Sequence, residues 1–469
     1  MRKGIRFVNI KVFVFVYIFF IFACRETVEN EESRLVRDYS QEVIWEWNEL
    51  FMIIEKDAKY YRPGPAPRAI SLLAYSAYEV CLPGMPNYRT LKYEFKENAP
   101  AEKIPKLKNG KGIHYPLAIN ASYALLMNKL FEGVSYESGQ TPGNVKKLIF
   151  DLESKLDSKF KLEIDQNIEL NFNNSKAWGQ EVALAIWQWS LEDKLASDAY
   201  KSYEQARPHA NGPTGEGFWQ TYNLGVPAAF PYWGDVYAYG VYSFEKIQPL
   251  LFKINYQDTS NRLFHEMNEV VQMTNAARAN FNGEESHIAR FWSDDRVGLT
   301  FSPPTRFVAI ANQVFKNKNT NLEKTVVTMA KLGLAIHDAG VCAWKTKFYY
   351  NIERPISMIQ RFKDPSWNLP WLPETPAFPA YPSGHSTFGW AAAEILTHEF
   401  GEYAMTDNCH ADKINLVGPP RSYNSFYQMA QENAMSRIPL GVHFRMDAEG
   451  GEILGKRVAN NILKLRWEK

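Results

Sequence analysis

Residues 380–387 read Ala-Tyr-Pro-Ser-Gly-His-Ser-Thr and run directly into the largely apolar stretch 388–396. Small and apolar residues in this order predict a helix that begins near Ser383. Backbone N–H groups at a helix N-terminus favour a bound anion, and Gly384 lets a ligand approach the backbone closely. We therefore interpret the stretch as an anion site, with His385 as a neighbouring group that exchanges protons near neutral pH.

Two basic segments flank this stretch. The first contains Lys347 and Arg354-Pro355, and the second contains Ser436-Arg437, His443 and Asp447. Arg and Lys donate short, charge-assisted hydrogen bonds to oxyanions. Lys347 and Arg354 are seven residues apart and can share one helix face, with Pro355 ending that helix at Arg354. Asp447 follows His443 by four residues, a spacing at which its carboxylate can orient the ring. Together the segments predict a pocket for a small tetrahedral or trigonal-bipyramidal oxyanion.

In chain order, these segments resemble the three-part signature of the type 2 phosphatidic acid phosphatase and vanadium haloperoxidase superfamily. The matching parts are Lys347-x6-Arg354-Pro355, Pro382-Ser383-Gly384-His385 and Ser436-Arg437-x5-His443-x3-Asp447. The runs 338–347, 378–381 and 436–447 resemble the vanadium-dependent haloperoxidases in particular. The close resemblance covers roughly residues 285–460.

This resemblance implies a vanadate cofactor and a role for each matching residue. His443 would be the axial ligand of vanadium, Asp447 its carboxylate partner and His385 the acid–base group. The vanadate oxygens would be held by Lys347, Arg354, Arg437, Ser383 and the Gly384 amide. Trp344 and Phe378 fall where the fungal chloroperoxidase branch places aromatic residues beside the halide. The implied reaction is oxidation of a halide by hydrogen peroxide to a hypohalous acid equivalent, with vanadate as a Lewis acid.

Two alternatives remain open at this point. A phosphatase on the same scaffold would use His443 as nucleophile, Asp447 as its partner and His385 as the acid that protonates the leaving alcohol. Its membrane-bound relatives place the motifs between transmembrane helices, and after the leader we expect no apolar run long enough to span. A non-catalytic, surface-anchored oxyanion-binding protein would need neither histidine for proton transfer. The aromatic pair favours the peroxidase, and among halides we favour iodide or bromide.

Helical apolar spacing recurs along the chain and alternating spacing is rare, which predicts an all-α fold. The predicted helices span 41–56, 68–80, 116–131, 144–160, 178–189, 261–280, 285–291, 305–315 and 322–349. We expect two helical bundles, an N-terminal helical half at 41–260 and a haloperoxidase- or phosphatase-like domain at 261–469, with the vanadate site in the C-terminal bundle. The irregular stretches 201–260 and 365–379 are predicted loops, the first a candidate wall of the pocket mouth and the second leading into the site.

The N-terminus has the pattern of an export signal. Basic residues precede an apolar run from Val12 to Ala23, and Cys24 follows. This predicts a lipoprotein-type signal peptide at 1–23, Cys24 as the lipidated first mature residue and a polar tether at 24–40. The protein would be periplasmic or at the cell surface, held to a bacterial membrane by its lipid alone.

The resemblance implies hydrogen peroxide, a halide and small organic acceptors of the halogen as partners. A formal net charge of +1 argues against a nucleic-acid partner. The four cysteines show no metal-binding spacing; with Cys24 lipidated, the other three allow one disulfide, and the sequence favours no particular pair.

Several other polar residues match no part of the signature. His265 and His337 fall within helical patterns as packed or surface residues, and His209 falls in a loop. His398 and His410 lie beyond the motif helix. Asp294 or Asp295 is expected to pair with a site arginine, as an acidic residue of the family does.

Overall fold

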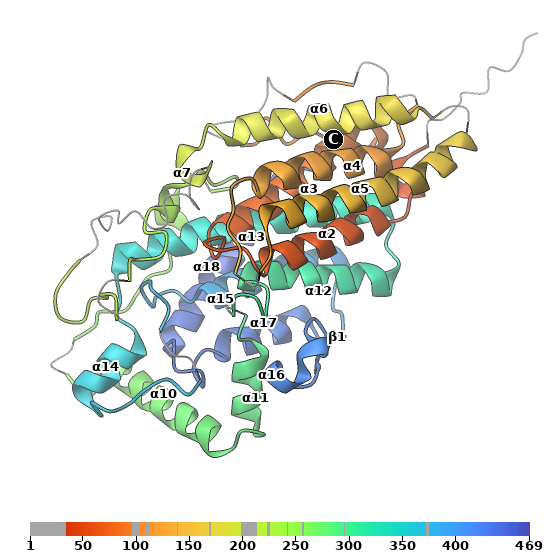
Figure 1. Cartoon of the computed structure of the whole chain (residues 1–469). Helices are drawn as coiled ribbons and strands as arrows, with labels where there is room; N and C mark the ends of the chain where they lie inside the picture. The colour runs from red at the N-terminus through yellow and green to blue at the C-terminus, as the bar shows by residue number, and fades with distance from the viewer. Residues whose placement is uncertain are drawn as a thin grey trace, which may run out of the picture. The chain divides into compact units, whose positions relative to one another are not determined.

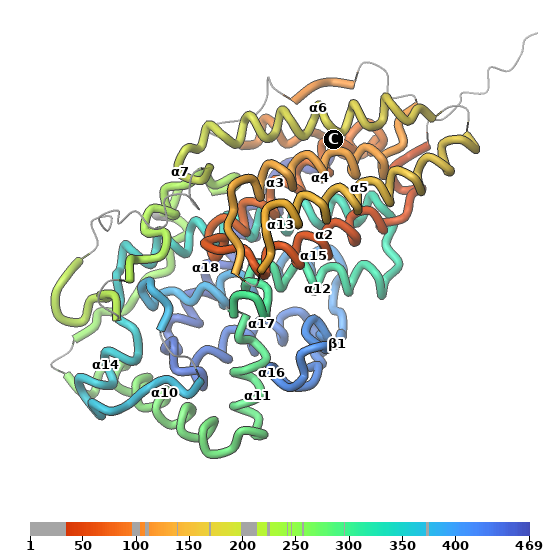
Figure 2. The backbone as a smooth tube through the Cα atoms, in the orientation of Figure 1, coloured from red at the N-terminus to blue at the C-terminus, as the bar shows by residue number. Residues whose placement is uncertain are grey.

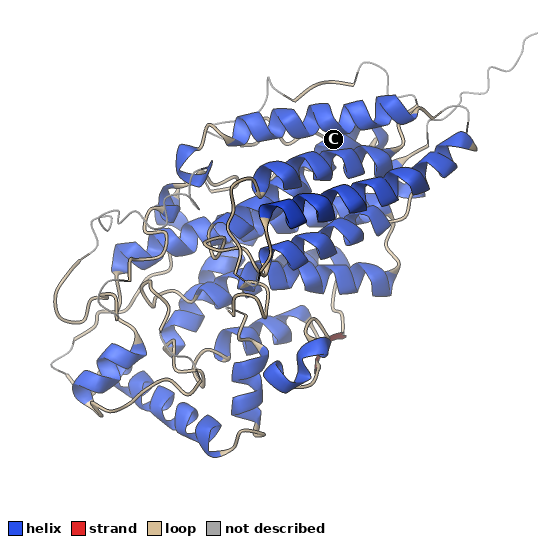
Figure 3. Cartoon of the chain, in the orientation of Figure 1, coloured by secondary structure: helices blue, strands red, loops and turns tan. Residues whose placement is uncertain are grey.

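The computed structural model describes residues 34–469, apart from 96–103, 108–111, 138, 168–169, 198–212, 223–225, 242, 256–257, 295 and 372–374. The predicted signal peptide, Cys24, His209 and Asp295 therefore lie outside the described residues. Leu35–Lys469 form one compact unit. Figure 3 shows that helix dominates this unit.

The N-terminal helices are α2 (Glu42–Glu55), α3 (Pro65–Cys81), α4 (Tyr115–Leu130), α5 (Pro142–Asp165), α6 (Phe172–Ser190), α7 (Lys194–Ser197) and α9 (Phe244–Ile247). The C-terminal helices are α10 (Arg262–Ala279), α11 (Glu284–Phe291), α12 (Pro303–Lys318), α13 (Leu322–Tyr350), α14 (Pro355–Phe362), α15 (Gly384–Phe400), α16 (Ile414–Val417), α17 (Phe426–Met435) and α18 (Arg445–Leu463). Two short antiparallel strands, β1 (Met405–Asp407) and β2 (Arg421–Tyr423), form the one sheet among the described residues. The all-α prediction is confirmed.

Helix α13 lies at the centre of the packing and contacts α3, α15 and α18 (Figure 1). Among the described residues it is the one helix long and apolar enough to cross a membrane, but its apolar window is entirely buried inside the protein. The expectation that no apolar run after the leader is long enough to span was therefore wrong. Burial against neighbouring helices is what such a run does in a protein core.

The two halves of the chain pack directly on one another. Helix α2 contacts α12, and α3 contacts α13 (Figure 2). The compact unit also begins before the predicted boundary at 41, because Val36 and Tyr39 of the predicted tether are buried in the core. The division into domains at residue 260 stays a prediction.

A second, smaller hydrophobic cluster supports the region after α13. It includes Leu263 and Val270 of α10, Ile356 and Ile359 of α14, and the segment 438–446. The same cluster contains Ala380 and Tyr381, which lead into α15. The three motif segments are thus held between this cluster and the central helices.

Candidate active site

Close packing of α18 on α15 brings the second and third motif segments together. A Cβ added at Gly455 would lie 2.5 Å from the Thr387 carbonyl oxygen, and one at Gly451 would lie 2.5 Å from the Ser386 Cβ. Only glycine permits this approach. The Ser383 N–H donates to the Asp447 carbonyl at 2.8 Å, which joins the N-terminal ends of the two helices.

Helix α15 begins where the sequence predicted. Ser383 is its N-cap, and its hydroxyl oxygen accepts a hydrogen bond from the Ser386 N–H. Gly384 is the first helical residue and lines the cavity described below. A helix N-terminus therefore faces that cavity, as an anion site requires.

Lys347, near the C-terminal end of α13, is fully buried. Its ammonium donates to the carbonyl oxygens of Pro379, Ala380 and Pro382 at 2.9, 3.0 and 2.5 Å. These bonds fix the loop that precedes α15. Burial, and then the charge of Arg354, hold the pKa of Lys347 well below its usual range, while the nearby carboxylate of Asp447 opposes that shift.

Arg354 is not on the helix of Lys347, so that prediction was wrong. Helix α13 ends at Tyr350, because Asn351 adopts a left-handed conformation with φ of 52°. Pro355 then begins α14, and Arg354 is its N-cap with extended backbone. A proline in the first helical turn starts a helix as readily as it ends one.

The Arg354 guanidinium nevertheless reaches the third motif segment. Its Nη1 donates to the Val442 carbonyl at 2.8 Å and contacts Nε2 of His443 at 3.2 Å. Its Nε donates to the Phe378 carbonyl at 2.8 Å. The Arg354 guanidinium thus links all three segments of the predicted site.

Hydrogen bonds on both ring nitrogens fix the state of His443. Nδ1 lies 2.8 Å from Oδ2 of Asp447, and that same oxygen accepts the Phe444 N–H at 2.9 Å. Because a guanidinium can only donate, the contact with Arg354 requires Nε2 to accept. The ring proton is therefore on Nδ1, and Nε2 presents a lone pair.

The electrostatics agree with a neutral ring. Burial, and then the charges of Arg354 and Lys347, hold the pKa of His443 well below its usual value. Burial raises the pKa of Asp447 to about 7, although the hydrogen bond from the Phe444 N–H and the charges of Lys347 and Arg354 lower it. The predicted pairing of Asp447 with His443 is present in the structure.

One backbone carbonyl connects the other two polar residues of the site. Arg437 Nη1 donates to the Trp292 carbonyl at 2.8 Å, and the Trp292 backbone also acts on His385, whose pKa it raises. His385 Nε2 has no hydrogen-bond partner among the described residues. Burial, and then Arg437, hold the pKa of His385 well below its usual range, so this ring too is neutral near pH 7.

These side chains surround a cavity of about 360 Å³. Of the predicted site residues, six line it: Trp344, Phe378, Gly384, His385, Arg437 and His443. Lys347, Arg354, Ser383 and Asp447 are not among its lining residues. The rings of Trp344 and Phe378 lie 5.0 Å apart at 52° and form an aromatic wall, as predicted. The predicted loops also contribute, through Ala229 and residues 375–378.

The sequence analysis missed several residues of the cavity wall. They are Arg62, Pro63, Ser293, Arg296, Val297, Pro303, Phe388 and Val442. Most come from turns or helix starts outside the signature. No spacing rule links them to the motifs.

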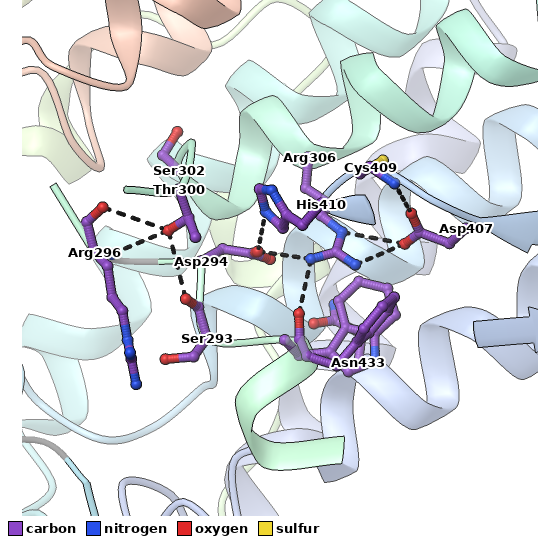
Figure 4. Close-up of polar contacts among 12 residues, drawn as sticks. Ser293, Asp294, Arg296, Thr300, Ser302, Arg306, Asp407, Cys409, His410 and Asn433 are labelled. Carbon is purple, nitrogen blue, oxygen red and sulfur yellow. Dashed lines mark hydrogen bonds and ion pairs between the residues drawn. The ribbon is translucent and has the colours of Figure 1, made fainter. Parts of the chain in front are cut away.

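Asp294 pairs with Arg306 rather than with a predicted site arginine, so the expectation is wrong for Asp294, while Asp295 lies outside the described residues. Figure 4 shows the Arg306 guanidinium between Asp294 and Asp407. Asp294 Oδ1 accepts from Arg306 Nη1 at 2.7 Å and lies 3.4 Å from His410.

The residues present fit vanadate. His443, Arg437 and the helix N-terminus at Gly384 line one cavity. Arg354 contacts His443 on the cavity wall, and the Lys347 ammonium lies 5.1 Å from the ring centroid of Phe378, another lining residue. Within the three motif segments, the buried cations Lys347, Arg354 and Arg437 outnumber the buried carboxylates of Glu353 and Asp447, and Glu353 is paired with Arg361 outside these segments. A buried excess of positive charge favours an anion.

Comparison with known proteins agrees with this geometry. Residues 327–467 match the family model of the second helical-bundle domain of vanadium chloroperoxidase. The vanadium chloroperoxidase of Curvularia inaequalis is 27% identical over a match that covers 34% of this chain and 35% of that protein. In its C-terminal part the chain is therefore similar to the vanadium haloperoxidases. The match spans only about a third of that curated relative.

Solved haloperoxidase structures resemble a larger part of the chain. A bacterial vanadium-dependent iodoperoxidase is 25% identical with a TM-score of 0.75, over 92% of this chain and 97% of that one. The holo form of a bacterial vanadium-dependent chloroperoxidase is 13% identical with a TM-score of 0.57, over 85% and 90% of the two chains. The second likeness is one of fold alone. The haloperoxidase fold therefore covers both halves of this chain.

Proposed function

We propose that the chain is a vanadium-dependent haloperoxidase that oxidises iodide or bromide with hydrogen peroxide to a hypohalous acid equivalent. The observation that carries this proposal is the state of His443. Its ring lines the cavity, Nδ1 is occupied by Asp447, and the unprotonated Nε2 accepts from Arg354, a hydrogen bond that a metal at Nε2 would replace. A neutral imidazole with its second nitrogen hydrogen-bonded to a carboxylate is a typical metal ligand.

When bound, vanadate supplies a Lewis acid that activates peroxide toward the halide. The chain's own residues would then hold and charge-balance its oxygens. Arg437 and the Gly384 N–H face the cavity directly, and Lys347 and Arg354 contribute positive charge from behind. His385 would accept a proton from hydrogen peroxide at Nε2 and return it to the leaving oxygen, since His385 lines the cavity and its Nε2 has no hydrogen-bond partner among the described residues.

The halide preference is supported by the cavity wall and by one relative. Trp344 and Phe378 present aromatic carbon rather than hydrogen-bond donors to an entering anion. Burying an anion costs its hydration energy, and the larger halides lose less of it than chloride does. The resembled iodoperoxidase has the highest TM-score of the solved structures described above.

The site geometry also suits a second candidate function. The His443–Asp447 pair is arranged as a nucleophile and its partner in phosphoryl transfer, so an acid phosphatase remains the alternative. A non-catalytic oxyanion-binding lipoprotein is the third. In both cases the same anion pocket would be used for a different purpose.

One pair of assays separates these functions. Purified protein reconstituted with orthovanadate is assayed with peroxide and each halide, and vanadate-free protein is assayed with a phosphomonoester. We expect iodide or bromide oxidation that requires vanadate and is lost in His443→Ala. Phosphomonoester hydrolysis without halide oxidation would support the phosphatase, and tight vanadate binding with neither activity would support the binding protein. Halide oxidation retained in His443→Ala would contradict the metal-ligand role.

We also propose that the protein is exported and anchored through a lipid on Cys24. The support is the sequence pattern of residues 1–24. Metabolic labelling with a radioactive fatty acid should mark the wild-type protein but not Cys24→Ser. Equal labelling of both proteins would contradict the anchor.

A further inference from the structure

The backbone of Trp292 acts on two residues of the site. Arg437 Nη1 donates to the Trp292 carbonyl at 2.8 Å. The same backbone raises the pKa of His385, as a carbonyl that accepts a ring N–H does. Because His385 Nε2 has no partner among the described residues, the nitrogen that donates to this carbonyl would be Nδ1, which leaves the lone pair on Nε2.

The segment that carries this carbonyl is held by Arg306. Arg306 Nη1 donates to the Phe291 carbonyl at 2.9 Å, one residue before Trp292. Its guanidinium also lies over the Phe291 and Trp292 rings, 4.5 and 4.3 Å from their centroids. The indole Nε1 of Trp292 donates to Glu432 at 3.0 Å. Both the ring and the neighbouring backbone of Trp292 are therefore fixed.

The Arg306 guanidinium is held by hydrogen bonds to two buried carboxylates, those of Asp294 and Asp407 (Figure 4). Nη1 donates to Asp294 at 2.7 Å, while Nε and Nη2 donate to Asp407 at 3.2 and 2.7 Å. Arg306, Asp294 and Asp407 are at most 1% exposed. A fixed guanidinium fork satisfies several acceptors at once, which a lysine ammonium cannot reproduce.

We propose that the buried cluster of Arg306, Asp294 and Asp407 is a positioning device, which holds the Trp292 carbonyl so that it sets the tautomer of His385 and the orientation of Arg437. Without the Arg306 guanidinium, the turn after α11 would lose its hydrogen bond at the Phe291 carbonyl and the ring contacts at Phe291 and Trp292. The carbonyl would then no longer hold Nδ1–H of His385 and Nη1 of Arg437 together. None of the three cluster residues lines the cavity, so they act through Trp292 rather than on the ligand.

The direct test is the variant Arg306→Lys, which keeps the positive charge and loses the fork. In vanadate-free, full-length protein with 15N-labelled histidine, NMR reports which nitrogen of His385 is protonated; a His385→Gln sample assigns the signal. We expect the wild type to show Nδ1–H, and the variant to show a mixture of tautomers. Orthovanadate titration followed by tryptophan fluorescence should give an affinity at least tenfold weaker.

A matched control uses the same helix and the same type of ion pair. Glu399 lies at the far end of α15 and accepts from Lys324 and Lys331, each at 2.6 Å, with its side chain 4% exposed. Glu399→Gln should lower thermal stability but leave the His385 signal and the vanadate affinity unchanged. Asp294→Asn serves as a milder second variant if Arg306→Lys does not fold, with the same direction expected.

An unchanged His385 tautomer and a vanadate affinity within twofold of wild type, in a folded variant, would overturn the proposal. Equal effects of Glu399→Gln would also overturn it, because they would reflect general destabilisation. The NMR measurement needs neither vanadate nor turnover. A protein that proved to be a phosphatase would therefore still report on the positioning device.

Discussion

Two hydrogen bonds of opposite direction determine which nitrogen of His443 carries the ring proton. Arg354 donates to Nε2 and Asp447 accepts from Nδ1, so the ring has one possible neutral tautomer. The sequence spacing of His443 and Asp447 predicted the second bond. Nothing in the sequence predicted the first, because the guanidinium approaches from a different helix.

Replacing Asp447 by asparagine should weaken vanadate binding about 10- to 100-fold, the usual cost of losing a carboxylate behind a metal-ligating histidine. The amide keeps the size of the side chain but loses the negative charge that stabilises Nδ1–H. Orthovanadate titration measures the effect. Glu452→Gln, on the same helix and partly exposed beside Lys456, is the control and should bind normally. Equal affinity of both variants would contradict the role of Asp447.

His337 gives a prediction on pH. Its Nε2 donates to the Tyr237 carbonyl at 2.8 Å, and burial lowers its pKa to about 4. The unfolded chain binds a proton on this residue below about pH 6.5, whereas the folded protein does not until about pH 4. Unfolding therefore takes up a proton in this window, and acidification from pH 7 to pH 5 should cost ~2 kcal/mol of stability through this residue.

The variant His337→Gln tests this, since its amide can still donate to Tyr237 but does not titrate. Urea unfolding at pH 7 and pH 5 should show a smaller stability loss in the variant. His265 is exposed on α10, so His265→Gln should behave like the wild type. An equal acid sensitivity of His337→Gln and wild type would rule out the buried histidine as a cause.

At the scale of the elements, the sequence predicted helices better than their ends. The predicted range 322–349 and the observed α13 (Leu322–Tyr350) agree within a residue. The proposed continuation to Arg354 failed because Pro355 was interpreted as a terminator, whereas it begins α14. The stop signal was Asn351, whose side chain tolerates the left-handed conformation.

The stability of the protein should therefore depend on which residue replaces Asn351. Asn351→Ala keeps a Cβ in the left-handed region, which costs about 1–2 kcal/mol relative to glycine, and loses the short polar side chain with which asparagine tolerates this conformation. It also removes the bonds from Nδ2 to the carbonyls of Pro213 and Trp219. Asn351→Gly loses the same two bonds but accepts the conformation. Thermal unfolding should find the alanine variant less stable than the glycine variant, and the reverse order would contradict the backbone argument.

For the whole molecule, composition and periodicity predicted the all-α class, and the motifs predicted which residues meet. Six of the ten predicted site residues line one cavity. The positions of Arg62, Arg296 and the Trp292 carbonyl could not be predicted, because they depend on long-range packing of turns. A backbone carbonyl, in particular, has no signature in a sequence. The boundary at residue 260 is likewise not visible as a break in the packing of α2 on α12 and α3 on α13.

If Leu35–Lys469 unfold as one unit, vanadate bound in the C-terminal half should stabilise both halves. A ligand at a hundredfold excess over its Kd adds about 2.7 kcal/mol to the folded state. Hydrogen exchange should then slow in α4 as well as in α15, and His443→Ala should abolish both effects. Protection confined to residues after 260 would instead favour two independently folding domains.

The central claim is that His443 is the residue through which this protein binds vanadium. Crystals grown with orthovanadate, measured at the vanadium absorption edge, test it directly. We predict one vanadium in the cavity, bonded to Nε2 of His443, with oxygens contacting Arg437 and the Gly384 N–H. Vanadium bound elsewhere, or an empty cavity at saturating orthovanadate, would contradict the account.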